Sequence, residues 1–188
     1  MAPDTFVIVT AYNEADRIAD TLAGLALAFP GAPVWVADDG STDHTAEIAR
    51  EAGAQVVRSE RMIGKGEAAT AAARQALRQA GEQSPGADPA ASSADAKAIF
   101  ILCDGDLAES ARELGPLAEP IGHEQADIAV AVFVKSVGGG LGLAVGFARW
   151  AIRRRCGLRT RAPISGQRAL SARALADVLP FAHAFGME

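Results

Sequence analysis

The sequence is poor in cysteine and in long apolar runs, and each of these two shortages excludes a class of protein. Its two cysteines, Cys103 and Cys156, give neither a disulfide framework nor a metal-ligand spacing, so a reducing cytoplasm is the expected location. No apolar stretch reaches the roughly 20 residues that a membrane-spanning helix needs. The first residues also lack the basic start of a signal peptide. With 188 residues, of which 22% are charged, the chain has the size and composition of a single globular domain.

Acidic residues are absent from one long stretch, residues 128–176. The same stretch contains nine basic residues: Lys135, Arg149, Arg153, Arg154, Arg155, Arg159, Arg161, Arg168 and Arg173. The rest of the chain carries nine basic and all 23 acidic residues, so the net charge of −5 hides a strong asymmetry. One interpretation is an anionic partner that meets the C-terminal part, and the other is a solvated basic helix face. We expect no nucleic-acid partner, and the sequence leaves a homodimer open.

Apolar strand-like segments alternate with helical segments along the chain. The predicted strands are Phe6–Val9, Val34–Ala37, Gln55–Arg58, Ile99–Cys103 and Ile128–Val134. The predicted helices follow an N-cap at Asn13 through Leu27 and cover about 44–52, 68–80, 111–117, 141–156 and 171–179. This alternation predicts an α/β fold: one domain, residues 1–188, with a mostly parallel central sheet flanked by helices. Residues 81–97 contain nothing large to bury and are predicted to form a flexible insertion.

Three polar clusters each follow directly on a predicted strand. They are Tyr12-Asn13-Glu14, Asp38-Asp39 and Asp104-Gly105-Asp106. Right-handed crossovers place the carboxyl ends of parallel strands at one edge of the sheet, where open α/β sheets bind ligands. We therefore expect the three clusters to lie close together.

Asp104-Gly105-Asp106 is the strongest local signal for chemistry. Two carboxylates separated by a small residue can ligate Mg²⁺ or Mn²⁺, which favour carboxylate oxygens together with phosphates. Gly105 lets the backbone turn and leaves room for a diphosphate. The alternative is a turn in which the aspartates cap the next helix. Asp38-Asp39-Gly40 has a similar alternative, because Gly40 makes a turn before the helix that Thr42 or Asp43 would cap.

The motifs taken together resemble a known family. Residues Val9–Glu14, Ala37–Asp43, Gly64-Lys65-Gly66 and Cys103–Leu107 resemble, in order and spacing, the family-2 glycosyltransferases of the GT-A fold. The similarity is strongest to the dolichyl-phosphate sugar synthase and glucosyl-3-phosphoglycerate synthase branches. It covers residues 5–110, and it continues more loosely through residues 163–168 and 185–188. The resemblance implies a GT-A-type sandwich that binds a UDP- or GDP-sugar.

The resemblance also implies roles for individual residues. The donor would be bound by Ala11, Tyr12, Glu14, Asp38, Asp39, Lys65, Asp104 and Gly105. Asp104 and Asp106 would hold Mg²⁺ or Mn²⁺, with Asp106 the more direct ligand. That metal would neutralise the departing nucleoside diphosphate. The expected reaction is an in-line displacement at the anomeric carbon with inversion.

The acceptor is expected to be anionic. An alcohol acceptor needs a general base, but residues 128–176 contain no carboxylate. A phosphate acceptor, such as a polyprenyl phosphate or a small phosphorylated acid, needs none. Arginines would hold it, often by bidentate contacts. The predicted acceptor residues are Arg161, Ser165, Gly166, Gln167 and Arg168. The competing interpretation makes Glu188 the catalytic base for a hydroxyl acceptor.

The resemblance divides the chain into a donor half, residues 5–110, and an acceptor half, residues 111–188. In relatives the chain continues beyond Phe185-Gly186-Met187-Glu188, and in one branch a later histidine completes the metal site. An alternative to a complete enzyme is therefore a truncated or non-catalytic protein that binds nucleotide-sugars. The segment Leu141–Ile152 has two interpretations as well: an amphipathic helix in peripheral contact with the inner face of a membrane, or a helix buried on the sheet.

Overall fold

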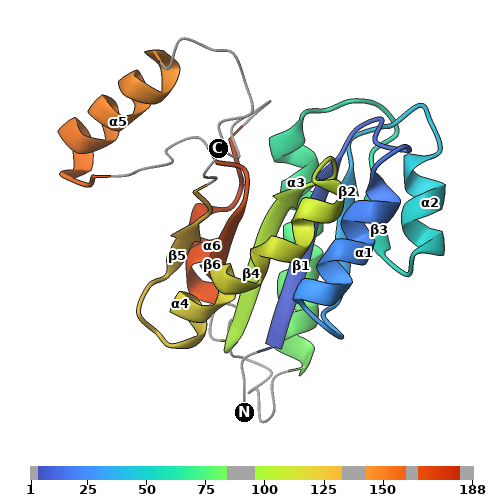
Figure 1. Cartoon of the computed structure of the whole chain (residues 1–188), viewed down its shortest axis with the longest axis horizontal. Helices are drawn as coiled ribbons and strands as arrows, with labels where there is room; N and C mark the ends of the chain where they lie inside the picture. The colour runs from blue at the N-terminus through green and yellow to red at the C-terminus, as the bar shows by residue number, and fades with distance from the viewer. Residues whose placement is uncertain (1–3, 84–95, 133–142, 160–164, 183–188) are drawn as a thin grey trace.

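A six-stranded sheet forms the centre of the molecule (Figure 1). The structure is a computed structural model that describes residues 4–83, 96–132, 143–159 and 165–182. The strands are β1 (Asp4–Ala11), β2 (Val34–Asp38), β3 (Gln55–Arg58), β4 (Ala98–Asp104), β5 (Ile128–Val130) and β6 (Arg168–Ser171). The helices are α1 (Ile18–Ala28), α2 (Thr45–Glu51), α3 (Lys65–Gln83), the 3-10 helix η2 (Ala108–Leu117), α4 (Ala118–Gly122), α5 (Leu143–Cys156) and α6 (Ala172–Val178).

The sheet is parallel over its first four strands. Its order is β3-β2-β1-β4-β6-β5, and β1 pairs in parallel with both β2 and β4. β6 runs antiparallel to β4, and β5 runs antiparallel to β6. The predicted α/β class with a mostly parallel sheet is confirmed. The sequence did not predict β6, whose reversed direction brings the residues before it to the carboxyl edge of β4.

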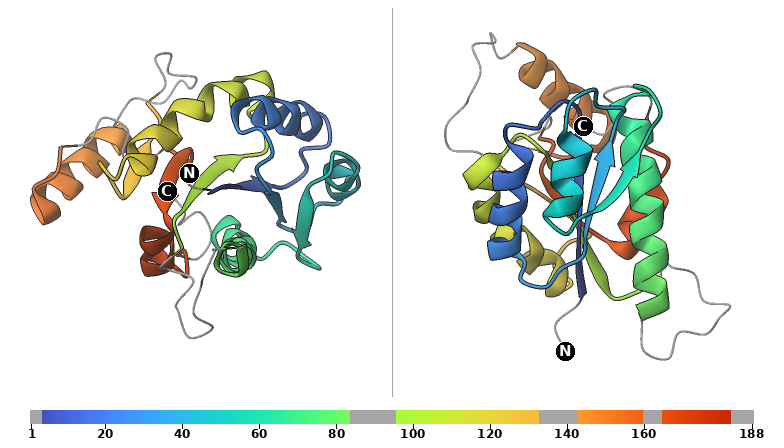
Figure 2. Two further views of the ribbon diagram at one scale, coloured as in Figure 1. Left: turned by 90° about the horizontal axis from the view of Figure 1, so that it is seen from below. Right: turned by 90° about the vertical axis from the view of Figure 1, so that its right-hand side faces the viewer.

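Helices cover both faces of the sheet (Figure 2). On one face, Phe6 and Phe100 stack with ring centroids 5.4 Å apart, and the alanines of α3 pack against them. Small side chains on this helix allow it to lie close to the large side chains of the strands. On the other face, Ile18 and Leu25 of α1 pack with Val9 and with η2. The continuous apolar runs of β1 and β4 are explained by burial on both faces.

Several element boundaries differ from the prediction. α1 begins at Ile18, not directly after Asn13, so the predicted N-cap is wrong. α3 extends from Lys65 to Gln83, so the first three residues of the predicted 81–97 insertion are helical. Residues 84–95 of that insertion lie outside the described residues. β5 ends at Val130, although the apolar run predicted a strand to residue 134.

α5 stands apart from the sheet (Figure 1). Its described side chains, from Gly146 onward, are exposed or half-buried, and Phe147 and Trp150 contact each other at 5.7 Å between ring centroids. The alternative of a helix buried against the sheet is therefore wrong. Within the described ranges, no helix is both long and apolar enough to span a membrane.

Candidate functional site

Asp104 ends β4 and is held by side chains from three different elements. Its Oδ1 lies 2.7 Å from Lys65 Nζ at the start of α3 and accepts a 3.1 Å hydrogen bond from Thr10 Oγ1 at the end of β1. Its Oδ2 accepts a 2.8 Å hydrogen bond from Gln167 Nε2 in the segment before β6. Both carboxylate oxygens are thus engaged, and Asp104 connects the parallel strands to the antiparallel end of the sheet.

Gln167 was predicted to contact the acceptor, but the structure places its side chain against Asp104. The residue is buried, and its amide oxygen accepts a 3.3 Å hydrogen bond from the Ser165 hydroxyl. Its main-chain oxygen accepts from the Ala131 N–H at 2.9 Å. Gly166 lies so close to Asp104 that a Cβ there would stand 2.7 Å from Oδ2. The predicted acceptor segment is therefore packed onto the predicted donor site.

The turn after β4 projects Asp106 into solvent. Gly105 is buried, donates to the Thr10 carbonyl at 2.8 Å and accepts from the Thr21 hydroxyl at 2.7 Å. Thr21 Oγ1 also accepts from the Ala108 N–H at 2.8 Å, and the N-cap of η2, Leu107, makes no side-chain capping bond. The alternative in which the aspartates cap this helix is thus wrong. Thr21 satisfies the start of η2, and the Asp106 side chain is exposed.

Asp104 and Asp106 can supply only part of the coordination of a divalent metal. Among the described residues, no group of three His, Cys, Asp or Glu side chains could enclose an ion. Asp104 is already paired with Lys65, whereas the Asp106 carboxylate is exposed at the edge of the sheet. One or two carboxylates, completed by phosphate oxygens and water, form the coordination that Mg²⁺ commonly has beside nucleotides. The residues therefore suit an ion that arrives with a diphosphate.

Asp38 and Asp39 are adjacent in sequence, but their carboxylates contact different segments of the chain. Asp38 is fully buried, lies 3.3 Å from Arg58 Nε and accepts from the Ser41 N–H at 2.9 Å. Asp39 accepts from the N–H groups of Ile63, at 2.7 Å, and Gly64, at 3.0 Å. It therefore fixes the segment that leads into α3, directly before Lys65.

Gly40 allows that segment to cross above the turn. Its φ is +75°, and a Cβ there would stand 2.4 Å from the Arg61 carbonyl carbon. Only glycine fits both conditions. The positive φ and the close approach of Arg61 fit the predicted change of chain direction at Gly40. The helix cap predicted at Thr42 or Asp43 is wrong, because the N-cap of α2 is His44 and it makes no side-chain capping bond.

The residues after β1 form a loop at the same edge. Ala11, the last residue of β1, is buried, while Tyr12, the first residue of the loop, is 40% exposed. The Glu14 carboxylate pairs with Arg17 at 2.8 Å. Burial raises the pKa of Glu14, Arg17 opposes that shift, and the nearby Asp106 charge adds to it. Glu14 and Asp106, predicted to bind donor and metal respectively, are thus electrostatic neighbours.

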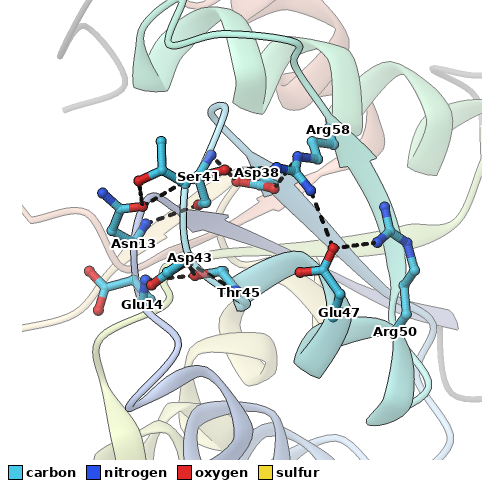
Figure 3. Close-up of polar contacts among 10 residues, drawn as sticks. Asn13, Glu14, Asp38, Ser41, Asp43, Thr45, Glu47, Arg50 and Arg58 are labelled. Carbon is cyan, nitrogen blue, oxygen red and sulfur yellow. Dashed lines mark hydrogen bonds and ion pairs between the residues drawn. The ribbon is translucent and has the colours of Figure 1, made fainter.

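Hydrogen bonds tie this loop to the loop after β2 (Figure 3). The N–H groups of Asn13, Glu14 and Ala15 donate to side-chain oxygens of Ser41, Thr45 and Asp43, at 2.9, 2.8 and 3.1 Å. Asn13 Oδ1 accepts in return from the Thr42 N–H at 2.8 Å. The sequence had suggested Asn13 only as a helix cap, and its real target lies 29 residues further along the chain. Thr10 was missed too, although parallel pairing places it directly opposite Asp104.

Two predicted site residues, Arg161 and Glu188, lie outside the described residues. Arg168 begins β6, opposite Leu102 of β4, and its guanidinium donates to the Ser165 carbonyl. Of the predicted acceptor residues, the structure thus brings Ser165, Gly166, Gln167 and Arg168 to the edge that carries Asp104.

Solved structures of a bacterial enzyme share this fold. Glucosyl-3-phosphoglycerate synthase from Mycobacterium tuberculosis, in complex with Mn²⁺, UDP-glucose and phosphoglyceric acid, matches with a TM-score of 0.68 and 26% identity. A complex with Mn²⁺, UDP and glucosyl-3-phosphoglycerate matches with a TM-score of 0.67 and 25% identity. In both cases the match covers 98% of this chain and 62% of the other. The chain therefore spans about three fifths of the length of these structures.

Sequence comparison identifies a relative and a family. Protein RfbJ from Shigella flexneri is 42% identical over 60 residues, which are 32% of this chain and 46% of RfbJ. Residues 6–155 match the family described as glycosyl transferase family 2. That match includes all four motifs at the carboxyl edge of the sheet, and it confirms the resemblance seen in the sequence. The chain belongs to glycosyl transferase family 2.

Proposed function

We propose that this chain binds a UDP- or GDP-sugar at the carboxyl edge of β1, β2 and β4 and transfers the sugar with inversion. One observation carries the proposal: Lys65 Nζ lies 2.7 Å from Asp104 Oδ1, and Asp106, two residues further along the chain, exposes its carboxylate at the turn after β4. A diphosphate with its metal needs that combination. Support comes from the M. tuberculosis synthase, whose structures contain Mn²⁺ together with UDP or UDP-glucose.

The donor would be held by the loops that end β1 and β2. Tyr12 offers an exposed aromatic ring for contact with the base or ribose. Glu14 would offer a carboxylate to ribose hydroxyls or a base N–H, and Ala11, the buried last residue of β1, precedes this loop. Asp39 acts indirectly by fixing the segment before Lys65, whose ammonium would approach the phosphates.

Asp106, supported by Asp104, would hold Mg²⁺ or Mn²⁺ together with the diphosphate. When bound, the metal would supply positive charge that stabilises the departing diphosphate. Lys65 would add a second positive charge on the opposite side. The bond from the anomeric carbon to the diphosphate oxygen breaks, and the electron pair leaves with that oxygen. The acceptor oxygen forms its bond from the other face of the sugar, which inverts the configuration.

The acceptor is proposed to be phosphorylated, because a phosphate oxygen attacks without a general base. The segment 165–167 lies against Asp104, so an acceptor beside it would be close to the sugar. Arg168 directly follows that segment as the first residue of β6 and would contribute positive charge. The M. tuberculosis synthase has been solved with phosphoglyceric acid, which supports a small phosphorylated acid as the acceptor. Because phosphoglyceric acid also carries a hydroxyl, that complex supports recognition of the acceptor's charge and does not identify the attacking oxygen. The hydroxyl-acceptor alternative depends on Glu188, outside the described residues.

A thermal-shift screen tests donor and metal binding. In the presence of Mn²⁺, UDP or GDP at a concentration of about 100 times the Kd of the nucleotide should stabilise the protein by about 2.7 kcal/mol. For a chain of this size, that corresponds to roughly 5–11 °C in Tm. Asp106→Ala should abolish the Mn²⁺-dependent part, whereas Glu51→Ala, at an exposed site in α2, should retain it. An undiminished shift in Asp106→Ala would contradict the metal assignment.

A transfer assay distinguishes an enzyme from a binding protein. Release of UDP from a UDP-sugar should accelerate when a phosphorylated acid is added, and glycerol should have a smaller effect. A thermal shift without any release of UDP or GDP would favour the non-catalytic alternative.

A further inference from the structure

The loop after β1 and the loop after β2 are joined by reciprocal hydrogen bonds (Figure 3). Three consecutive N–H groups of the first loop, from Asn13 to Ala15, donate to side chains of Ser41 and Asp43 in the second loop and of Thr45 at the start of α2. Two of those acceptors, Ser41 and Thr45, are buried, with exposed fractions of 2% and 0%. Buried acceptors that are already fixed by the fold hold their donors in one geometry.

Asn13 lies at the centre of this connection and contributes in both directions. Its N–H donates to Ser41 Oγ at 2.9 Å, and its side-chain Oδ1 accepts from the Thr42 N–H at 2.8 Å. Its φ is +55°, in the left-handed region. Glycine, asparagine and aspartate adopt that region at low cost, whereas other side chains are strained there. The position therefore requires both a particular backbone conformation and a side-chain acceptor.

The connection determines where neighbouring groups lie. The residues on either side of Asn13 are Tyr12 and Glu14, and the Glu14 N–H is itself held by Thr45. The second loop follows Asp39, which fixes the segment leading to Lys65. One network of hydrogen bonds thus connects the loop that carries Tyr12 and Glu14 to the segment that precedes Lys65.

We propose that Asn13 is a positioning residue for the donor. Its left-handed backbone and its bonds to the second loop hold Tyr12 and Glu14 in the geometry that receives the nucleoside. The inference rests on the proposed function, and it gives a role to the Ser41-Thr42 pair, which contacts no donor in the proposed arrangement. Asn13 itself is not proposed to touch the reacting atoms.

Calorimetric titration with UDP or GDP and MnCl₂ tests this role in three variants. Asn13→Ala loses both properties and should weaken nucleotide binding about tenfold. Asn13→Gly keeps the backbone but loses the acceptor, so its affinity should lie between those of Asn13→Ala and wild type. Asn13→Asp keeps both and should bind within about threefold of wild type. The rescue by aspartate would not occur if asparagine contacted the nucleotide through its amide N–H₂.

Gly53→Ala provides the matched control for stability. Gly53 also has a positive φ, +87°, with nothing within 4 Å of a Cβ, and it lies between α2 and β3. Alanine there should lower Tm through the same backbone strain while leaving nucleotide affinity within twofold. Equal affinity of Asn13→Ala and wild type would overturn the proposal, as would a comparable loss of affinity in Gly53→Ala. A wild-type protein that binds neither UDP nor GDP would refute the proposed function itself.

Discussion

At the scale of single residues, Gly166 shows how closely the two ends of the sheet are packed. A Cβ at this position would stand 2.7 Å from Asp104 Oδ2. That carboxylate is held by Lys65 and Gln167, so it cannot move away without breaking those contacts. We expect Gly166→Ala to lower the free energy of unfolding by about 1–3 kcal/mol, as in other overpacked sites. Urea denaturation measures the change.

Gly146→Ala is the control for that experiment. Gly146 lies in α5, and nothing stands within 4 Å of a Cβ there. Alanine favours an exposed helix over glycine by up to about 1 kcal/mol, so stability should be unchanged or higher. If Gly166→Ala proved as harmless as Gly146→Ala, Asp104 would not be fixed as the structure shows.

Glu14 makes stability depend on pH. Burial raises its pKa above the usual range, and Arg17 only partly opposes this. A raised carboxyl pKa means that the folded state binds a proton more readily than the unfolded state. The charged form therefore reduces stability, and this reduction develops as pH rises through the raised pKa. We expect Glu14→Gln to be more stable than wild type at pH 7, in chemical denaturation.

The same comparison at low pH provides the check. Below the ordinary carboxyl range Glu14 is protonated in both states, so the advantage of Glu14→Gln should disappear. A stability difference that is constant with pH would show that the carboxyl charge is not its cause. At pH values where the wild-type Glu14 is charged, Glu14→Gln should bind the nucleotide more weakly than wild type. The variant lacks the carboxylate that we propose accepts hydrogen bonds from the ribose or the base.

At the scale of secondary-structure elements, the edge strand β3 is secured by its last residue. Arg58 Nε lies 3.3 Å from the fully buried Asp38, and an Arg58 terminal nitrogen donates to the Ser41 carbonyl at 2.8 Å. Arg58→Met would leave the Asp38 charge buried without its cation, which we expect to cost about 3 kcal/mol in urea denaturation. Arg50→Met removes only an exposed pair with Glu47, at 3.9 Å, and should cost less than about 1 kcal/mol. Similar losses in the two variants would refute this role of Arg58.

The central parallel strands β1 and β4 could be predicted because each contains a long apolar run that is buried on both faces. The runs are Phe6–Val9 in β1 and Ile99–Cys103 in β4. β3 has only four residues, but it contains two adjacent β-branched valines after a glycine. β6, Arg168–Ser171, is equally short, has only Ala169 and Leu170 as apolar residues and could not be predicted. Its pairing with β4 depends on contacts far apart in sequence. Short strands of this kind are determined by tertiary packing more than by local pattern.

The candidate site was predictable in its location and less so in its contacts. Parallel topology was enough to bring Asp39 and Asp104 to one edge. The partners of the polar side chains could not be predicted. Asn13 has the residue type of a helix cap, yet its side chain bonds to Thr42 because the next loop lies beside it. The family resemblance assigned Gln167 to the acceptor. Its amide N–H₂ in fact donates to Asp104, and nothing in the local sequence indicates that contact.

At the scale of the whole molecule, the acidic and basic parts of the sequence correspond to the donor and acceptor halves that we propose. All 23 acidic residues lie outside the stretch 128–176, which contains half of the 18 basic residues. Asp39, Asp104 and Asp106 belong to the acidic part, where a metal would offset the charge of a diphosphate. Arg168 belongs to the basic part. A donor and an anionic acceptor would then approach regions of opposite charge.

This arrangement predicts that acceptor binding depends on salt. An exposed ion pair contributes up to about 1 kcal/mol, so screening it should raise the KM for a phosphorylated acid about fivefold. Raising NaCl from 0.1 M to 1 M shortens the Debye length from about 10 Å to about 3 Å, which is enough to screen such pairs. The KM for glycerol, an uncharged acceptor, should not change over the same range at saturating donor. Arg168→Gln should flatten the salt dependence for the phosphorylated acid. A salt dependence equal for both acceptors would mean that the arginines do not recognise the acceptor's charge.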